Sequence, residues 1–312
     1  MHPVLFRIGG FDVAFYGPLI ALGVLLGVMV AVRRAKTIGL EADLIFDLTF
    51  YCVIIGFVGS RVFFILGDLR GFFQSPSEYI FSRQGYVFFG GLIFALIFAL
   101  WFLHRKRADP WQVGDVMAPS IALGHMFGRI GCFFSGCCYG AVCLPQWRSL
   151  GVTFPKADPL TGTEAYSFAY TDQLTRGLIG PEALRTLPVY PVQLFEAAAN
   201  LLIFLGLIWL WRKRRFRGQI FAGYLIAYGT ARFLLEFLRG DYDERNLFKL
   251  LARGQMSQII CLAAIAIGAY IWWRRRATPL ESPVLATDNA TPPADPAPAE
   301  NKRKARHHRH HR

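Results

Sequence analysis

The sequence has little charge for its length. Of its 312 residues, only 18% are Asp, Glu, Lys or Arg and 54% are hydrophobic, whereas about a quarter of an ordinary soluble domain is charged. This composition excludes an ordinary soluble globule. Acidic residues are especially few, since 21 Asp and Glu stand against 34 Lys and Arg, a net charge of +13. In a soluble chain that excess would raise the possibility of nucleic-acid binding.

The position of the positive charge argues against that possibility. Long apolar runs alternate with short basic clusters, which lie at 33–36, 105–107, 212–217 and 274–276. Basic loops between apolar runs are typical of membrane proteins, whose cytoplasmic loops carry an excess of Lys and Arg. We therefore expect a multi-pass membrane protein in contact with membrane lipid and with no nucleic-acid partner.

The cysteine pattern lacks the spacing of a zinc site or of a disulfide framework. No two of the six cysteines form a Cys-x-x-Cys pair, and four of them lie within residues 132–143. The N-terminus also lacks the basic segment and the small-residue cleavage site of a secretory signal. We expect its first apolar run, about twenty residues long, to be a retained membrane span.

Seven stretches are long enough to cross a membrane core, which takes about 17–25 helical residues. The sequence predicts spans at 13–32, 44–67, 86–103, 116–134, 189–211, 219–238 and 255–273. Charged residues interrupt the second, fourth and sixth, but membrane helices tolerate charges that face a bundle interior. The predicted fold is an all-α integral membrane protein with seven transmembrane helices.

The loops predict the orientation and the domain organisation. Every second loop is basic, which places the N-terminus outside and the C-terminus in the cytoplasm. Residues 135–188, between the fourth and fifth spans, are too long for a turn and predict a small extracytoplasmic cap. Residues 1–276 then form the membrane domain. Residues 277–312 are rich in Pro and Ala and end in a basic run, which predicts a disordered cytoplasmic tail.

Three arginines, Arg61, Arg129 and Arg232, stand inside predicted spans. Each costs about 2.5–3.5 kcal/mol at the centre of a membrane helix, so each needs a partner or a function. Arg232, Glu236 and Arg239 recur at i, i+4 and i+7 and share one helix face. Two arginines against one carboxylate leave positive charge towards the interior, with Arg239 unpaired. The alternative is that Arg232 and Glu236 simply neutralise each other.

The fourth predicted span is rich in glycine. Residues 124–140 read Gly-His-Met-Phe-Gly-Arg-Ile-Gly-Cys-Phe-Phe-Ser-Gly-Cys-Cys-Tyr-Gly. Glycine lets other backbone or a ligand approach closely, and a broken helix end beside an arginine suits a phosphate group. The alternative is close helix packing, with Arg129 paired to a carboxylate. His125 lies one turn before Arg129 and is either a hydrogen-bonded interior residue or a catalytic base.

The fifth span begins with a proline, Pro191, at its first turn, where the missing N–H costs nothing. Gln193 and Glu196 follow on one helix face. We expect them either to contact a substrate or, for Glu196, to neutralise one of the arginines.

Together these segments resemble the bacterial prolipoprotein diacylglyceryl transferases. Residues 128–140 are similar to the family signature Gly-Arg-x-Gly-Asn-Phe-x-Asn-Gly-Glu-x-x-Gly. Further similar segments are Phe15-Tyr-Gly17, Gly59-Ser-Arg61, Gly90-Gly91-Leu92, Pro191-x-Gln-Leu-Phe-Glu196 and Tyr228-Gly-x-x-Arg-Phe-x-x-Glu-Phe-x-Arg239. They follow the family order over residues 11–273, which makes the resemblance specific.

The resemblance implies an enzyme of the bacterial cytoplasmic (inner) membrane. It would move the diacylglyceryl group of phosphatidylglycerol to the lipobox cysteine of preprolipoproteins, forming a thioether and releasing glycerol phosphate. Arg129 and Arg232 would bind the phosphate. The other residues implied to contact substrate are Tyr16, Arg61, Gly128, Gly131, Gly140, Gln193, Glu196, Glu236 and Arg239. No metal or cofactor is implied, because two arginines can offset the developing phosphate charge.

The sequence departs from the family at several places. Phe89 and Tyr190 stand where the family commonly has histidine, and Cys132 and Cys137 replace the Asn and Glu of the signature. A phenylalanine and a tyrosine cannot accept a proton at neutral pH, yet the thiolate is the form of cysteine that attacks. His125, the remaining histidine inside the predicted spans, is therefore the candidate base, with a carboxylate or the leaving phosphate as alternatives.

Two other functions explain part of the pattern. A membrane thiol oxidoreductase could use Cys132, Cys137, Cys138 and Cys143, although it would not need three arginines within the membrane. A transporter for an anionic solute would explain the arginines, but obvious inverted repeats are absent from the sequence. Transfer of a diacylglyceryl group to a lipobox peptide would separate both from the main interpretation.

Overall fold

A computed structural model of the protein describes residues 4–9, 11–81, 85–157, 167–240 and 255–277. The chain divides into two units, residues 1–279 and 280–312. The predicted tail lies outside the described residues, apart from residue 277.

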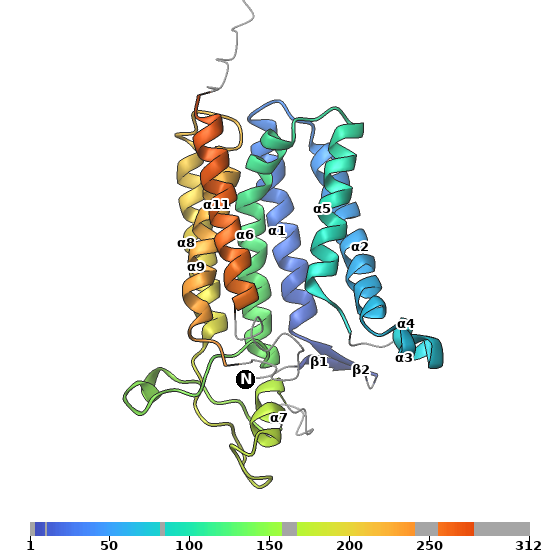
Figure 1. Cartoon of the computed structure of the whole chain (residues 1–312), viewed down its shortest axis with the longest axis vertical. Coiled ribbons are helices and arrows are strands. Elements are labelled where there is room, and N and C mark those ends of the chain that lie inside the picture. Colours follow the sequence, from blue (N-terminus) through green and yellow to red (C-terminus); the bar gives the residue numbers. More distant parts are fainter. Residues whose placement is uncertain (1–3, 10, 82–84, 158–166, 241–254, 278–312) are drawn as a thin grey trace, which may run out of the picture. The chain divides into compact units, whose positions relative to one another are not determined.

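The first unit is mostly helical. Its described elements are β1 (Val4–Ile8), β2 (Phe11–Ala14), α1 (Tyr16–Lys36), α2 (Ala42–Gly67), α3 (Leu69–Gln74), α4 (Pro76–Phe81), α5 (Phe88–Arg105), α6 (Pro110–Ser135), η1 (Pro145–Leu150), α7 (Phe168–Thr175), α8 (Val192–Trp211), α9 (Gln219–Glu236) and α11 (Gln255–Arg275). The long helices run side by side as a bundle, while η1, α7 and the hairpin of β1 and β2 lie at one end of it (Figure 1).

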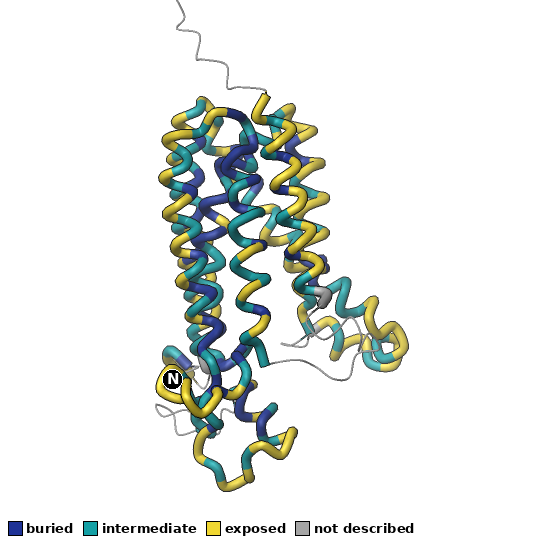
Figure 2. Tube along the Cα trace, turned by 60° about the vertical axis from the view of Figure 1, so that its left-hand side comes forward, coloured by how far each residue is buried: buried dark blue, intermediate teal, exposed yellow. Residues whose placement is uncertain are grey.

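Helix α6 is the centre of the bundle. It packs against α1, α8 and α9, while α2 pairs with α5 and α11 covers α9. Dark buried segments accordingly run along the interior of the bundle (Figure 2). Close packing depends on glycines, because a Cβ at Gly27 would lie 3.2 Å from the Ser120 carbonyl oxygen, and one at Gly91 would lie 2.7 Å from that of Gly56. Small residues let membrane helices approach in this way.

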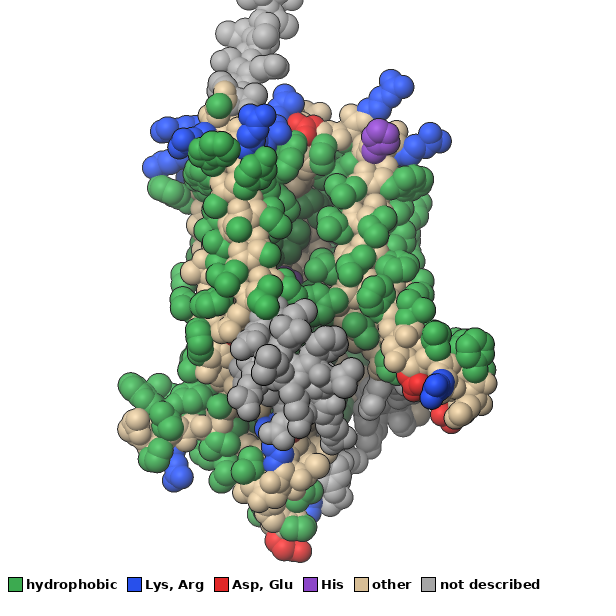
Figure 3. All heavy atoms as spheres, in the orientation of Figure 1, with side chains coloured by type: hydrophobic (Ala, Val, Ile, Leu, Met, Phe, Trp, Pro, Cys, Tyr) green, Lys and Arg blue, Asp and Glu red, His purple; other side chains and the backbone are tan. Residues whose placement is uncertain are grey.

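Five of the long helices, α1, α2, α5, α8 and α11, are long and apolar enough to cross a membrane. Their outward faces are apolar, and green side chains cover the flank of the bundle in Figure 3. Lys and Arg gather at one end of the bundle, where α1 and α11 finish in Arg34, Lys36 and Arg275 (Figure 3). The chain is therefore a multi-pass integral membrane protein.

Helices α6 and α9 have 26 and 18 residues and occupy the predicted fourth and sixth spans. They are less apolar than the other five because they carry the polar interior of the bundle. Asp115 of α6, only 1% exposed, accepts hydrogen bonds from the backbone N–H groups of Gly218, Ile220 and Phe221 at 2.7–2.9 Å. These groups lie at the start of α9, where N–H groups lack helical partners. Asp115 therefore joins the two helices.

Asp115→Ala is expected to destabilise the protein by about 1–3 kcal/mol, because it leaves buried N–H donors of α9 without their acceptor. Thermal unfolding in detergent micelles measures the loss. Asp172→Ala, which removes only an exposed i,i+4 pair with Arg176, is the control and is expected to change stability by less than about 0.5 kcal/mol. Equal melting temperatures for the two variants would contradict this role of Asp115.

The boundaries of the elements differ from the sequence prediction mainly at the N-terminus. Residues 13 and 14 belong to strand β2, and α1 begins at Tyr16. The all-α prediction missed this antiparallel hairpin, in which β1 and β2 pair across a turn containing Gly9 at φ +54°. The sequence prediction joined strand β2 to the first span because the apolar residues of the strand continue into α1. Helix α6 starts at Pro110, earlier than predicted, because Asp109 caps the Trp111 N–H at 2.9 Å.

The described part of the segment between α6 and α8, which we call the cap, forms a small structure at the end of the bundle (Figure 1). Its own apolar cluster contains Tyr139, Phe154, Ala169 and Val189. An antiparallel bridge between Gly140 and Arg239 ties it to the end of α9. The cap is thereby held beside the ends of α6 and α9.

Candidate functional site

Glu196 is the centre of a buried cluster of charges at the cap end of the bundle. Its Oε2 lies 2.5 Å from Arg129 Nε, and its Oε1 lies 3.5 Å from Arg232 Nη1 and 3.8 Å from Arg239 Nη1. The Glu196 side chain is only 5% exposed. Three predicted site arginines, from α6, α9 and the residues just after α9, therefore meet one carboxylate of α8.

Arg232 also pairs with Glu236, four residues later on α9, as one sequence alternative expected. The expectation that Arg239 stays unpaired is wrong, because Glu196 reaches it from the neighbouring helix. Among the described residues, three guanidinium groups thus face two carboxylates. Guanidinium groups fixed together in this way suit an anionic ligand, which they can bind through charge-assisted hydrogen bonds.

A row of buried acceptors lies beside the arginines on α8. Gln193, Glu196 and Asn200 are each less than 5% exposed and follow one another on one helix face. The Oε1 atom of Gln193 and the Oδ1 atom of Asn200 have no hydrogen-bond donor among the described residues, while Glu196 meets the arginines. A small cavity is lined by Glu196, Asn200, Tyr228 and Arg232. Buried acceptors without donors are costly, so the row is suited to a ligand that carries hydroxyl groups.

The end of α6 shapes the other side of the site. Gly136 ends the helix with φ +65°, and the Cys137 N–H then donates back to the Cys132 carbonyl oxygen at 3.2 Å. This is the glycine-ended turn typical of helix C-termini. It returns the chain to the last turn of α6, so the Sγ atoms of Cys132, Cys137 and Cys138 all lie within 4.8 Å of one another.

Gly136→Ala is expected to lower the free energy of unfolding by more than about 1 kcal/mol, because alanine disfavours the positive φ at this position. A Cβ there would also lie 2.5 Å from the Ser167 Cβ. Gly177→Ala is the matched control, since Gly177 has φ +70° but open space around it. Thermal unfolding should show the larger loss for Gly136→Ala. Equal losses of stability would mean that the positive φ alone explains the effect and that the close contact with Ser167 adds nothing.

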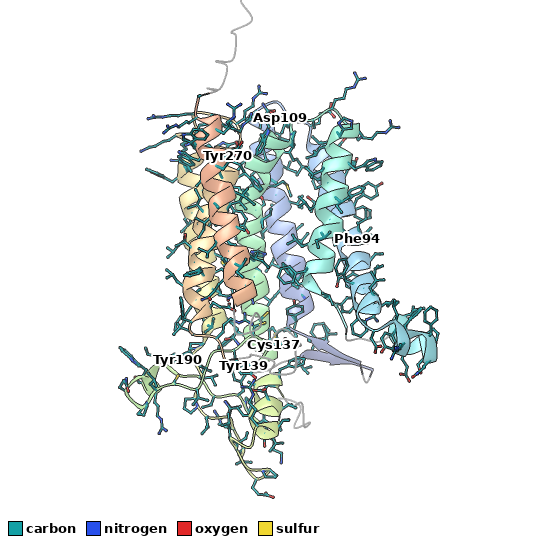
Figure 4. All side chains as sticks on the ribbon, in the orientation of Figure 1. Phe94, Asp109, Cys137, Tyr139, Tyr190 and Tyr270 are labelled. Carbon is teal, nitrogen blue, oxygen red and sulfur yellow. The ribbon has the colours of Figure 1, made fainter. Side chains whose placement is uncertain are left out.

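The cysteines do not form the disulfides that the oxidoreductase alternative needs. All six are free thiols in the structure. Cys143 is buried in the cap and is not part of the group of three. Figure 4 shows Cys137 at the cap end of the bundle, near Tyr139.

Other predicted site residues surround this end of α6. Gln193 Nε2 donates to the Cys137 carbonyl oxygen at 2.8 Å. Tyr16 packs on Gly131, where a Cβ would lie 2.9 Å from its ring, and interacts electrostatically with the three thiols. Gly128 borders open space, whereas a Cβ at Gly140 would lie 2.5 Å from the Tyr190 carbonyl oxygen. Gly131 and Gly140 thus permit close packing, and Gly128 leaves room.

His125 lies on α6 one turn before Arg129, deeper in the bundle. Its Nδ1 is 3.3 Å from the Tyr224 hydroxyl, and its ring packs against Tyr228 with the centroids 5.1 Å apart. Tyr228 and Arg129 also interact electrostatically. His125 is thereby connected to the arginine cluster through Tyr228.

Arg61 is held elsewhere. It donates to the carbonyl oxygens of Ile80 and Gly85 at 3.1 Å and lies over the Tyr86 ring, near the start of α5. Phe89, at one position where histidine was expected, is 48% exposed on α5. Tyr190, at the other, exchanges backbone hydrogen bonds with Gly140 and Ala141 in the cap. Neither substituted position thus contributes a polar group to the contacts around Glu196.

Sequence reasoning missed two parts of the site. Asn200 completes the acceptor row, and an asparagine inside an apolar span was the available signal. The signal for the three-thiol group was the set of four cysteines within residues 132–143, but which three meet depends on a turn whose shape the sequence did not predict.

The fold and the site together define a class: integral membrane proteins with a buried cluster of arginines around a carboxylate. Comparison with known proteins identifies the family. The family model described as "Prolipoprotein diacylglyceryl transferase" matches residues 3–274. The chain therefore belongs to the prolipoprotein diacylglyceryl transferase family and is a transferase of the membrane.

Curated relatives agree with this assignment. The chain is 31% identical to the phosphatidylglycerol–prolipoprotein diacylglyceryl transferase of Clostridium tetani over 272 residues, which is 87% of this chain and 97% of that protein. It is 32% identical to transferase 2 of Clostridium perfringens over 84% of this chain and 92% of that protein. It is 28% identical to the corresponding protein of Thermosynechococcus vestitus over 85% of this chain and 89% of that protein.

Proposed function

We propose that this chain transfers the diacylglyceryl group of phosphatidylglycerol to the lipobox cysteine of preprolipoproteins in the bacterial inner membrane. The names of its relatives specify phosphatidylglycerol and a prolipoprotein as substrates. The observation that carries the proposal is the buried cluster of Arg129, Arg232 and Arg239 around Glu196.

The arginines suit the charge that develops during the reaction. The attacking sulfur forms a bond to the glyceryl carbon, and the bond from that carbon to the phosphate oxygen breaks. The phosphodiester monoanion becomes the phosphate monoester dianion of glycerol phosphate. Arg129 and Arg232 would bind the phosphate, with Arg239 as a further contact. Cations fixed in place before the reaction stabilise the more charged transition state better than the substrate.

The acceptor row on α8 suits the glycerol headgroup. The side-chain oxygens of Gln193 and Asn200 are buried and lack donors among the described residues. The two hydroxyls of the phosphatidylglycerol headgroup are donors, and a headgroup without them would leave these oxygens unpaired. Tyr16 lies at the same end of the bundle and is a further candidate contact for the headgroup. We propose that His125 is the base that accepts the proton of the acceptor thiol.

The proposed topology has seven spans, with α6 and α9 as the two polar ones. The basic end of the bundle faces the cytoplasm, in accordance with the excess of Lys and Arg in cytoplasmic loops. The N-terminus and the cap then lie outside, where secreted preprolipoproteins emerge. Residues 1–276 form the transferase domain. Residues 277–312 are proposed to be a basic cytoplasmic tail near anionic lipid, and no nucleic acid takes part.

The test is a transfer reaction with the purified full-length chain, phosphatidylglycerol vesicles and a lipobox peptide. Mass spectrometry should show the peptide gaining a diacylglyceryl group, with release of glycerol phosphate. A peptide with serine in place of its cysteine should gain nothing, and phosphatidylethanolamine should not replace phosphatidylglycerol. An unmodified cysteine peptide would overturn the proposal, and reductant-dependent thiol exchange instead would favour an oxidoreductase.

A further inference from the structure

The three-thiol group at the end of α6 is the strongest feature that the proposed function does not use. Cys132 is buried, Cys137 and Cys138 are half-buried, and all three are free. Their Sγ atoms lie within 4.8 Å of one another. Zinc binds thiolate sulfur at about 2.3 Å, so sulfurs in a tetrahedral site lie about 3.8 Å apart. The group therefore needs only small side-chain movements to hold a zinc ion.

The number of ligands indicates an open site. No histidine or carboxylate belongs to this group in the described part of the chain. Structural zinc sites are usually closed by four protein ligands, whereas catalytic ones have three and keep one position for water or substrate. Three sulfurs thus match the catalytic arrangement.

Positive charge lies beside the three thiols. Arg129 and Arg239 interact electrostatically with the Cys138 thiol. Cysteine binds metal as the thiolate, and a neighbouring positive charge stabilises that form.

The backbone of the group is held in position. Cys138 has φ +56°, in the left-handed region that residues other than glycine rarely adopt. Gln193 bonds the Cys137 carbonyl oxygen at 2.8 Å, and the turn at Gly136 connects Cys137 to Cys132. Strained backbone held by its surroundings is common at functional sites. Gln193 also connects the thiols to the acceptor row on α8.

We propose that Cys132, Cys137 and Cys138 bind one zinc ion, and that its open position takes the lipobox cysteine thiol and presents it as the attacking thiolate. This inference rests on the proposed function. It also revises the expectation that no metal takes part.

The reaction balances without an oxidant, because zinc remains Zn²⁺ throughout. Coordination releases the thiol proton, which passes to His125 and then to water. The sulfur forms the thioether bond to the glyceryl carbon, and the electron pair of the breaking carbon–oxygen bond leaves with the phosphate. Arg129 and Arg232 stabilise the resulting dianion. The neutral thioether is a weaker zinc ligand than a thiolate, so the product can leave.

The first experiment measures zinc by mass spectrometry in the full-length protein purified without chelators. Wild type is expected to contain one zinc per chain, and Cys132→Ser and Cys138→Ser little or none. Cys138→Gly is a second variant, because glycine accepts the positive φ at this position and should preserve the fold. Cys143→Ser, in the same cap but outside the group, should retain zinc. Loss of zinc only in Cys143→Ser, or no zinc in wild type after zinc is supplied, would overturn the proposal.

The second experiment replaces zinc with cobalt, whose absorption reports bound thiolates. A cysteine-containing lipobox peptide should change the spectrum, and the same peptide with serine should not. His125→Gln should still show this change, because the metal binds the thiol without that base. A cobalt spectrum that does not respond to the cysteine peptide would overturn the role of the open position.

Activity separates this inference from the proposed function. Removing zinc with a chelator should abolish transfer, and adding zinc back should restore it. Full transfer by metal-free protein would overturn the zinc site and leave the proposed function intact. A zinc-loaded protein whose cobalt form binds the peptide thiol, yet which transfers nothing from phosphatidylglycerol, would support the thiol site and overturn the proposed function.

Discussion

Arg129→Ala is expected to abolish diacylglyceryl transfer while the protein stays folded and inserted in the membrane. Removing one fixed group that stabilises developing negative charge typically lowers the rate by about 10²–10³-fold. The fold should survive because Glu196 retains its ion pairs with Arg232 and Arg239. Arg129→Lys should also lose most activity, since lysine lacks the planar fork that binds a phosphate through two hydrogen bonds.

The measurement is the initial rate of transfer from phosphatidylglycerol to a lipobox peptide, with size-exclusion profiles as the check on folding. Arg232→Ala should behave in the same way. The control is Arg176→Ala, which removes an arginine of the cap whose ion pair with Asp172 is local and exposed. Near-normal turnover by Arg129→Ala would exclude a phosphate-binding role for that residue.

His125→Gln is expected to lower the rate of transfer by about 10²–10⁴-fold, the usual contribution of a general base. A neutral imidazole can accept the thiol proton. Binding of phosphatidylglycerol should survive, because the arginines that hold the phosphate are unchanged. His125→Ala should show the same loss of rate.

Initial rates from about pH 6 to about pH 9 check this prediction, a range that brackets ordinary histidine titration. His104→Gln, at the opposite end of α5 from the cap, is the matched control. A His125→Gln variant that keeps more than about a third of the wild-type rate would contradict the base assignment. His125 would then be a structural residue that pairs with the Tyr224 hydroxyl and packs on Tyr228.

The helices of this protein could largely be predicted from composition along the chain. Each predicted span coincides with a long helix, and the five most apolar of these helices can cross a membrane. This worked because a membrane span must be about twenty apolar residues long, whatever its neighbours are. The hairpin at the N-terminus was missed because its apolar strand residues run on into α1 without a change in composition.

The site could be predicted only within each helix. The spacing of Arg232, Glu236 and Arg239 placed them on one face of α9 and its extension, and the pair of Arg232 and Glu236 was expected. The contact of Glu196 with three arginines could not be deduced, because it depends on how α6, α8 and α9 pack together. Arg61 also stands inside a predicted span, but it does not join this cluster. It donates to backbone carbonyl oxygens near α5 instead.

The sequence by itself determined the membrane class, the helices, and which residues are too polar to face lipid, because these follow from the cost of placing charge in hydrocarbon. The family resemblance was also visible in it. Only the tertiary structure decided which polar residues meet. Ion pairs between helices depend on packing distances that no local pattern encodes. The three-thiol group likewise depends on the turn at Gly136, whose left-handed backbone returns Cys137 and Cys138 to Cys132.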